Sequence, residues 1–202
     1  PGSPRGDRLQ PHHRHRMTFS ELTTLGGYRC GEVASAMQKC IRRGLADDAL
    51  FWATELDRAG YSEYVWKRLK IIASEDVGLA SNETTLLVQA LYSSWTEQRK
   101  KKDERHAPER LFLVHAVIAL AIAPKSRLID HALIAMYEAP REAREIPDFA
   151  LDKHTARGRK LGRGWEHFWK EGALLAGEAQ LPDPYKGIAR ATRREEQGEL
   201  SL

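Results

Sequence analysis

The stretch that decides the fold is residues 109–126, with the sequence ERLFLVHAVIALAIAPKS. From Leu111 to Ala123 every residue except His115 is apolar. This run is too short to cross a bilayer, which takes about 20 residues, and long for a buried strand. Its richness in Ala and Leu predicts a helix that stops before Pro124. A helix that is apolar all round is buried on all sides, so we expect it at the centre of the domain, with His115 in the core or at an interface.

Segments with apolar residues three and four positions apart flank this central helix. They predict helices over about 32–43, 46–59, 62–75, 82–99 and 127–138. Ser62 is expected to cap the third helix, and Gly44 and Gly60 to end the first and the second, which then form an antiparallel hairpin. No good strand pattern is present, so the predicted class is all-α, with about six to eight helices and an irregular C-terminal third.

Each predicted helix has a set of side chains expected to face inward. The sets are Val33, Met37 and Cys40 or Ile41; Leu50, Phe51, Thr54, Leu56 and possibly Trp52; Val65, Trp66, Leu69, Ile72 and Ala73; Leu86, Leu87, Ala90, Leu91 and Trp95; and Leu128, Ile129, Ala132, Leu133 and Met136.

The length of 202 residues predicts one domain with tails. Residues 1–16 lack periodicity and are expected to be a disordered or added extension ahead of a natural start at Met17. Residues 17–190 form the predicted single helical domain, whose C-terminal third wraps the helical body. Residues 191–202 are expected to be a polar, frayed tail.

The net charge of +4 overstates how basic the domain is. Residues 1–16 contain four arginines and one aspartate, which leaves a net charge of only +1 for the rest of the chain. The overall charge therefore does not indicate nucleic-acid binding, and only a local basic patch could do so. Cys30 and Cys40 do not share a helix face, which favours a reduced, cytoplasmic protein. The sequence contains no membrane span, signal peptide, C-x-x-C or H-E-x-x-H pattern, so no cofactor and no metal are predicted.

The segment 152–170, DKHTARGRKLGRGWEHFWK, concentrates basic and aromatic residues between glycines. Glycines let a backbone approach a ligand, cations contact phosphate, and aromatic rings stack on bases. The candidate nucleic-acid or phosphate-binding residues are Lys153, His154, Arg157, Arg159, Lys160, Arg163, Trp165 and His167. Two alternatives stay open: the aromatic residues dock the segment while the cations are solvated, or the segment binds a protein partner.

Two other charged groups have structural interpretations. Adjacent helical residues point about 100° apart, so Glu75 and Asp76 are expected to hold a turn or a cation such as Lys125 or Arg127, and not to work as a catalytic pair. The run from Arg99 to Arg105 is interpreted as a solvated helix end or loop, with a nucleic-acid patch as the alternative. No catalytic residues are predicted, although an enzyme of unrecognised type stays open.

Four segments, read together, resemble a known family. They are ADDALFWATELDRAG (46–60), WKRLKIIASEDVGLA (66–80), HAVIALAIAPKS (115–126) and WEHFWKEGALLAGEAQLPDPYKG (165–187). Their order and spacing are similar to those in the C-terminal domain of the replication-associated recombination protein A ATPases, whose eukaryotic relatives are the Werner-helicase-interacting proteins. The resemblance covers roughly residues 28–188.

The resemblance implies a helical domain similar to clamp-loader collars, homotetramer formation and work at stalled replication forks. It implies DNA, single-stranded-DNA-binding protein or a separate ATPase subunit as partners, and a nucleoid-associated, cytoplasmic location without a membrane. The sequence departs from full-length members because no G-x-x-x-x-G-K-[ST] is present, so ATPase activity is not carried over. The basic segment at 152–170 is a second departure. The implied function is therefore a non-enzymatic oligomerisation and interaction domain, with a nucleic-acid-binding accessory protein as the alternative.

Overall fold

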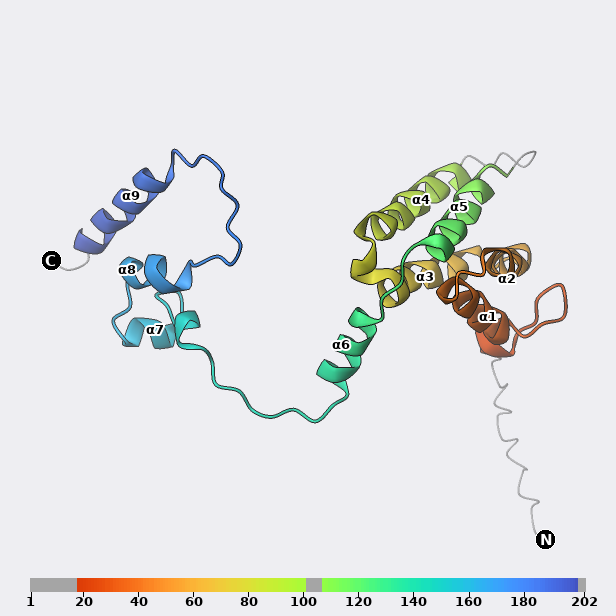
Figure 1. Ribbon diagram of the computed structural model, residues 1–202, viewed down its shortest axis with the longest axis horizontal. Helices are drawn as coiled ribbons and strands as arrows, with labels where there is room; N and C mark the ends of the chain where they lie inside the picture. Colours follow the sequence, from red (N-terminus) through yellow and green to blue (C-terminus); the bar gives the residue numbers. More distant parts are fainter. Residues whose placement is uncertain (1–17, 101–106, 200–202) are drawn as a thin grey trace, which may run out of the picture. The chain divides into compact units, whose positions relative to one another are not determined.

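The structure is a computed structural model that describes residues 18–100 and 107–199. Within these ranges the regular elements are all helices or short helical turns, and there is no strand beyond an isolated bridge between Thr23 and Arg29 (Figure 1). The predicted all-α class is confirmed. The predictions for residues 1–16 and for the run 101–105 fall outside the described residues.

The chain divides into two compact units, Pro1–Ala139 (unit 1) and Pro140–Leu202 (unit 2). Each unit has its own described elements, and each is treated separately below. A single domain over 17–190, with the C-terminal third wrapped on the helical body, stays a prediction.

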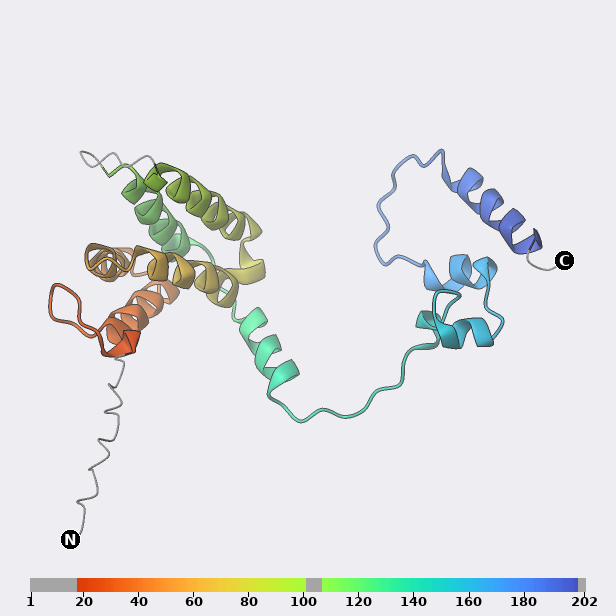
Figure 2. The same cartoon turned by 180° about the vertical axis from the view of Figure 1, so that it is seen from behind.

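Unit 1 is a bundle of helices (Figures 1 and 2). Its elements are η1 (Phe19–Glu21), α1 (Cys30–Arg42), α2 (Ala46–Arg58), α3 (Ser62–Ile72), η2 (Ala73–Val77), η3 (Gly78–Ala80), α4 (Asn82–Lys100), α5 (Glu109–Ile122) and α6 (Leu128–Tyr137). All six long helices of this unit therefore lie where the hydrophobic spacing predicts them.

Glycines end the first two helices, as the sequence predicts. Gly44 and Gly60 have φ angles of 75° and 86°, a left-handed conformation that costs glycine little. The resulting α1–α2 pair packs closely in the bundle. One capping prediction is wrong: the residue before α3 is Tyr61, and Ser62 instead donates a hydrogen bond to Asp57 at 2.6 Å.

The core of unit 1 contains most of the predicted inward side chains. The fully enclosed large side chains include Met37, Ile41, Leu56, Val65, Trp66, Leu69, Ile72 and Trp95. Three predictions are wrong, because Phe51, Leu86 and Ala90 are exposed. On α2 and α4 the smaller residues Ala49, Ala53 and Val88 take the inner positions, since small side chains let neighbouring helices approach closely.

The central helix α5 is buried on one side only, which corrects the prediction that it is enclosed all round. Its inner face consists of Leu113, Ala116, Val117, Leu120 and Ala121. The opposite face exposes Leu111, His115, Ile118 and Ile122, so His115 is not a core residue of this chain. Unit 1 has too few helices to surround α5, although its sequence is apolar all round.

The helix α6 has no buried residue, so the prediction that its apolar side chains face inward is wrong. Leu128, Ile129, Leu133 and Met136 are between 40% and 56% exposed, and Ala132 is exposed as well. Within unit 1, α6 contacts mainly η2 and η3, and Figure 1 shows it at the edge of the bundle. Within the described part of unit 1, no long helix covers its apolar side chains.

Unit 2 is built from short elements. They are η4 (Asp148–Ala150), α7 (Ala156–Lys160), α8 (Trp165–His167), η5 (Phe168–Gly172) and the longer α9 (Lys186–Glu199). Residues 191–199 continue α9, where the sequence predicts a polar tail, and 200–202 lie outside the described residues.

Candidate functional site

The predicted basic and aromatic segment folds as α7, α8 and η5 of unit 2. Thr155 begins α7, because its hydroxyl accepts a hydrogen bond from the Gly158 backbone N–H at 2.9 Å and donates one to the Asp152 carbonyl at 3.0 Å. Gly158 is buried against that same carbonyl, and a Cβ there would lie 1.8 Å from the Asp152 oxygen. The backbone of Gly158 therefore approaches the backbone of Asp152 and Leu151 closely.

Two of the predicted phosphate-binding cations bind the backbone of their own unit. Arg163 donates to the carbonyls of Asp148 and Leu151 at 2.8 and 2.7 Å and pairs with the Asp148 carboxylate at 2.5 Å. This hydrogen bond from Arg163 lowers the pKa of Asp148 below its ordinary value. Arg159 donates to the carbonyls of Lys153 and His154. Both side chains therefore help to fold the segment.

The two predicted histidines differ in their contacts. His154 Nδ1 lies 2.8 Å from the Asp152 carboxylate, and its ring meets Trp165 and Phe168 edge-on. Hydrogen bonds from the His154 side chain and backbone lower the pKa of Asp152. Among the described residues, the buried Nδ1 atom of His167 has no hydrogen-bond partner.

The remaining predicted residues divide between the aromatic group and solvent. Lys153 lies over the ring of Trp165, with Nζ 3.3 Å from the ring centroid. Arg157 and Lys160 are exposed, and no ion pair or hydrogen bond of their side chains is found within the described ranges. The structure thus brings Lys153, His154 and Trp165 together and points Arg159 and Arg163 to backbone carbonyls.

The sequence analysis missed the cations of α9. Arg193 lies 4.9 Å from the ring of Trp165, and Arg190 lies 5.6 Å from the ring of Trp169. Together with Lys186, these residues are spaced four and three positions apart, which places them on one helix face. That spacing is a detectable signal, but the sequence analysis assigns Arg193 to the polar tail 191–202 and gives Lys186 and Arg190 no role.

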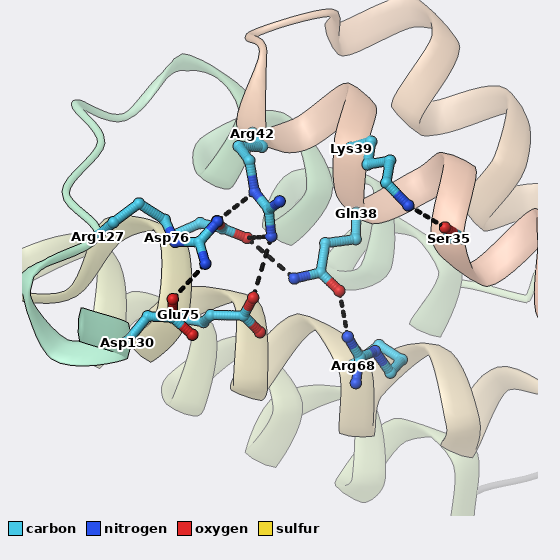
Figure 3. A network of polar contacts seen from close by, with 9 residues as sticks. All are labelled: Ser35, Gln38, Lys39, Arg42, Arg68, Glu75, Asp76, Arg127 and Asp130. Carbon is cyan, nitrogen blue, oxygen red and sulfur yellow. Dashed lines mark hydrogen bonds and ion pairs between the residues drawn. The ribbon is translucent and has the colours of Figure 1, made fainter. Parts of the chain in front are cut away.

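A second polar cluster lies in unit 1, around the acidic pair Glu75 and Asp76 (Figure 3). Asp76 is fully buried in the π-helical turn η2, where its carboxylate accepts hydrogen bonds from Arg42 Nε at 2.5 Å and from Gln38 at 3.1 Å. Arg42 also pairs with Glu75 at 3.0 Å. The acidic pair does bind a cation, as predicted, but that cation is Arg42 and not the predicted Lys125 or Arg127.

The same cluster fixes the connection from α5 to α6. The Asp76 carbonyl accepts a hydrogen bond from the Ser126 backbone at 2.9 Å, and Arg127 pairs with Asp130 in the first turn of α6. Lys125 donates to backbone carbonyls at the end of α5; burial lowers the pKa of its amine, and Asp76 opposes that shift. Gly78 lies against Ile129, since a Cβ there would be 3.1 Å from that side chain. These contacts set the start of α6 and leave its apolar body uncovered.

Within residues 18–100 and 107–199, no group of three or more His, Cys, Asp or Glu side chains is placed to hold a metal ion. None of the helices described is both long enough and apolar enough to span a membrane.

Comparison with known proteins places this all-helical fold in a class of ATPase-associated domains. The family model described as MgsA AAA+ ATPase C terminal matches residues 45–197. The chain belongs to this family, and the resemblance predicted from four segments is confirmed.

The similar proteins include relatives named replication-associated recombination protein A. The protein from Bacillus subtilis is 35% identical over 77% of this chain, that from Escherichia coli K12 is 32% identical over 77%, and that from Haemophilus influenzae is 30% identical over 79%. The aligned region covers 36%, 35% and 36% of those relatives, respectively, so the chain spans about a third of their length.

Proposed function

We propose that this domain is a non-enzymatic assembly module that joins copies of the chain into a homotetramer through exposed, mainly apolar residues of α5 and α6. We call these residues the assembly surface: Leu111, His115, Ile118, Ile122, Leu128, Ile129, Leu133, Ile134, Met136 and Tyr137. The observation that carries the proposal is α6, an apolar helix with no buried residue. A helix of that composition is stable in water when another element covers it.

The spacing within the assembly surface favours another helix as the occupant. Leu111, His115, Ile118 and Ile122 are four, three and four positions apart, as in the seam of a coiled coil. Ile129, Leu133 and Met136 on α6 repeat the same spacing. Each seam is therefore suited to pack against a helix.

A second copy of this chain fits such a surface. An interface related by a two-fold axis brings the same patch of both copies together, and an apolar patch is complementary to itself. A tetramer with three two-fold axes needs more than one such contact, and α5 and α6 offer two separate helix faces. The assembly needs no ligand and no catalytic group.

The relatives support the proposed setting. Their printed name links them to replication and recombination, and the family model names an AAA+ ATPase. We therefore propose that the assembled domain serves DNA replication, recombination and repair in the cytoplasm, at the nucleoid. Single-stranded-DNA-binding protein and an ATPase subunit are the proposed partners.

Light scattering of the full chain at low and high salt tests the proposal. We expect a species of about 92 kDa, four times the chain mass of 22.9 kDa, that persists at about 1 M salt because apolar contacts are not screened. A monomer at both salt concentrations would contradict the assembly role.

Single substitutions locate the interface. Ile122→Glu on α5 and Leu133→Glu on α6 each place a charge at an exposed position, so we expect both variants to keep their helicity while the tetramer dissociates to dimers. The two changes combined are expected to give monomers. Leu25→Glu is the matched control, because Leu25 is 75% exposed outside the assembly surface. A tetramer that survives the double change would overturn the assigned surface.

A further inference from the structure

Unit 2 contains an open cleft that lies outside the assembly surface. One wall is made by α8 and η5, and the other by α9. The cleft has a volume of about 710 Å³ and is lined by His154, Trp165, Phe168, Trp169, Ala189, Thr192 and Arg193. We call it the aromatic cleft. A neighbouring hollow of about 420 Å³ shares Trp169 and Ala189 with it and extends past Tyr185, Lys186 and Arg190.

We propose that the aromatic cleft binds single-stranded nucleic acid, with bases stacked on its aromatic wall and phosphates held by the cations of α9. The prediction from sequence placed such a site on the 153–170 segment alone. The structure uses Arg159 and Arg163 of that segment for internal hydrogen bonds and adds a row of cations from another helix.

The aromatic wall has the geometry that base stacking needs. Trp165 and Trp169 lie one helical turn apart with their rings 6.0 Å apart and inclined by 23°, so they are nearly parallel. Phe168 meets both rings edge-on and holds them in place. All three side chains are only half-buried, which leaves part of each ring accessible from the cleft. Stacking on such rings accepts any base, since every base has a π-face.

The cations form a row beside these rings. Lys186, Arg190 and Arg193 follow one face of α9 over about 10 Å of helix. Arg190 and Arg193 lie over the indoles of Trp169 and Trp165, so their guanidinium groups are held next to the stacking surface. Lys153 adds a fourth cation over Trp165. Phosphates that follow a stacked base would meet this row.

The charge of the lining favours nucleic acid over an acidic or proline-rich peptide. Among the side chains that the structure describes, those lining the aromatic cleft include Arg193 and no carboxylate, whereas Glu178 and Asp183 line the neighbouring hollow. In the neighbouring hollow, the Asp183 side chain accepts hydrogen bonds from the backbone of Tyr185 and Lys186 and so caps α9. A single strand is required, because the bases of a duplex stack on one another and present no free face.

The test uses the full chain and a fluorescein-labelled oligonucleotide of twenty thymidines, titrated between 50 and 200 mM salt. Trp169→Ala is expected to weaken binding about tenfold, and Trp169→Phe to restore most of it, because the phenyl ring still stacks. Arg190→Ala combined with Arg193→Ala is expected to make the salt slope shallower by about 1.4, which corresponds to two lost phosphate contacts on a single strand.

The matched control is Arg157→Ala combined with Lys160→Ala, which removes two exposed cations outside the cleft. We expect its affinity to stay within about twofold of that of the wild type and its salt slope to stay the same. If this control variant loses as much affinity as the variant with both α9 arginines replaced, the predicted basic segment binds the strand and the cleft does not. An oligonucleotide that fails to bind while an acidic peptide quenches the tryptophan fluorescence would also overturn the proposal.

Light scattering of each variant separates this site from the assembly role. The α9 pair consists of exposed side chains in unit 2, so we expect its mass to match that of the wild type. If a variant loses nucleic-acid binding while its mass in solution is unchanged, the result supports binding in the aromatic cleft, whichever oligomer the wild type forms.

Discussion

The two units of this chain are stabilised in different ways. Unit 1 buries nearly all of the enclosed apolar side chains in the described ranges, including Trp66, Trp95 and Leu120. In the described part of unit 2 the only apolar side chain classed as buried is Leu151. Its order comes from hydrogen bonds of Arg159 and Arg163 to backbone carbonyls and from cations over indole rings.

This difference changes how positive charge is interpreted. In unit 1 the cation Arg42 compensates the charge of one buried carboxylate. That carboxylate belongs to Asp76, which is enclosed and accepts hydrogen bonds from Arg42 and Gln38. In unit 2 several cations pack over indole rings or donate to backbone carbonyls. A basic segment in a small, weakly cored unit therefore does not by itself indicate a ligand, and the geometry must separate structural cations from exposed ones.

The largest effect expected within unit 2 comes from Gly158→Ala. The added Cβ would lie 1.8 Å from the Asp152 carbonyl oxygen, and a backbone atom cannot move aside as a flexible side chain can. We expect unit 2 to lose its fold, seen as collapse of the NMR indole signals of Trp165 and Trp169 to unfolded positions. Gly187→Ala is the control, because nothing lies within 4 Å of its added Cβ. Retention of native indole signals in Gly158→Ala would refute the close approach.

Asp76→Ala is expected to destabilise unit 1 by about 3 kcal/mol, because it leaves Arg42 and Gln38 without their buried acceptor. Urea unfolding followed by fluorescence of the buried tryptophans measures the change. Glu63→Ala serves as the control, since Glu63 pairs with Arg99 at the surface and such pairs contribute at most about 1 kcal/mol. Equal losses in the two variants would remove the distinction between the buried network and the surface.

The smallest expected effect is a loss of stability of unit 2 at acidic pH. Hydrogen bonds from Arg163 and His154 hold the pKa values of Asp148 and Asp152 below the ordinary 3.8. A carboxyl whose pKa is lower in the folded state stabilises that state fully above about pH 3.8, and this contribution is lost as pH falls through the lower folded value. We therefore expect the indole signals of unit 2 to weaken below about pH 4, and Asp148→Asn with Asp152→Asn to remove part of that dependence. A pH profile unchanged by the double substitution would argue against these two groups.

The positions of the helices in unit 1 followed from local rules. Gly44 and Gly60 end helices because a left-handed residue costs glycine little, and the periodic apolar residues of α1 and α3 pack inward as predicted. The aromatic character and the family of the chain were also evident from sequence. The errors occur where burial depends on neighbouring elements: Phe51, Leu86 and the apolar side chains of α6 are exposed because no long helix in the described part of unit 1 covers them.

The candidate site was predicted only in part. The sequence identified Lys153, His154 and Trp165, which do lie together. It did not identify Arg190 and Arg193, because these residues are distant in sequence and reach the indoles only through the fold of unit 2. Nor did the sequence show that Arg163 donates hydrogen bonds within unit 2 whereas Arg157 is exposed. The residue type does not reveal whether a backbone carbonyl lies within hydrogen-bond distance.

The sequence by itself therefore determined the helical class, the helix positions in unit 1 and the family, because these depend on local spacing and on segments that can be compared directly. The tertiary structure alone decided which faces of α5 and α6 stay exposed, which cation holds Asp76, and which cations gather at the aromatic cleft. Those outcomes depend on contacts between residues far apart in the chain, where packing geometry selects one partner from many of similar chemistry.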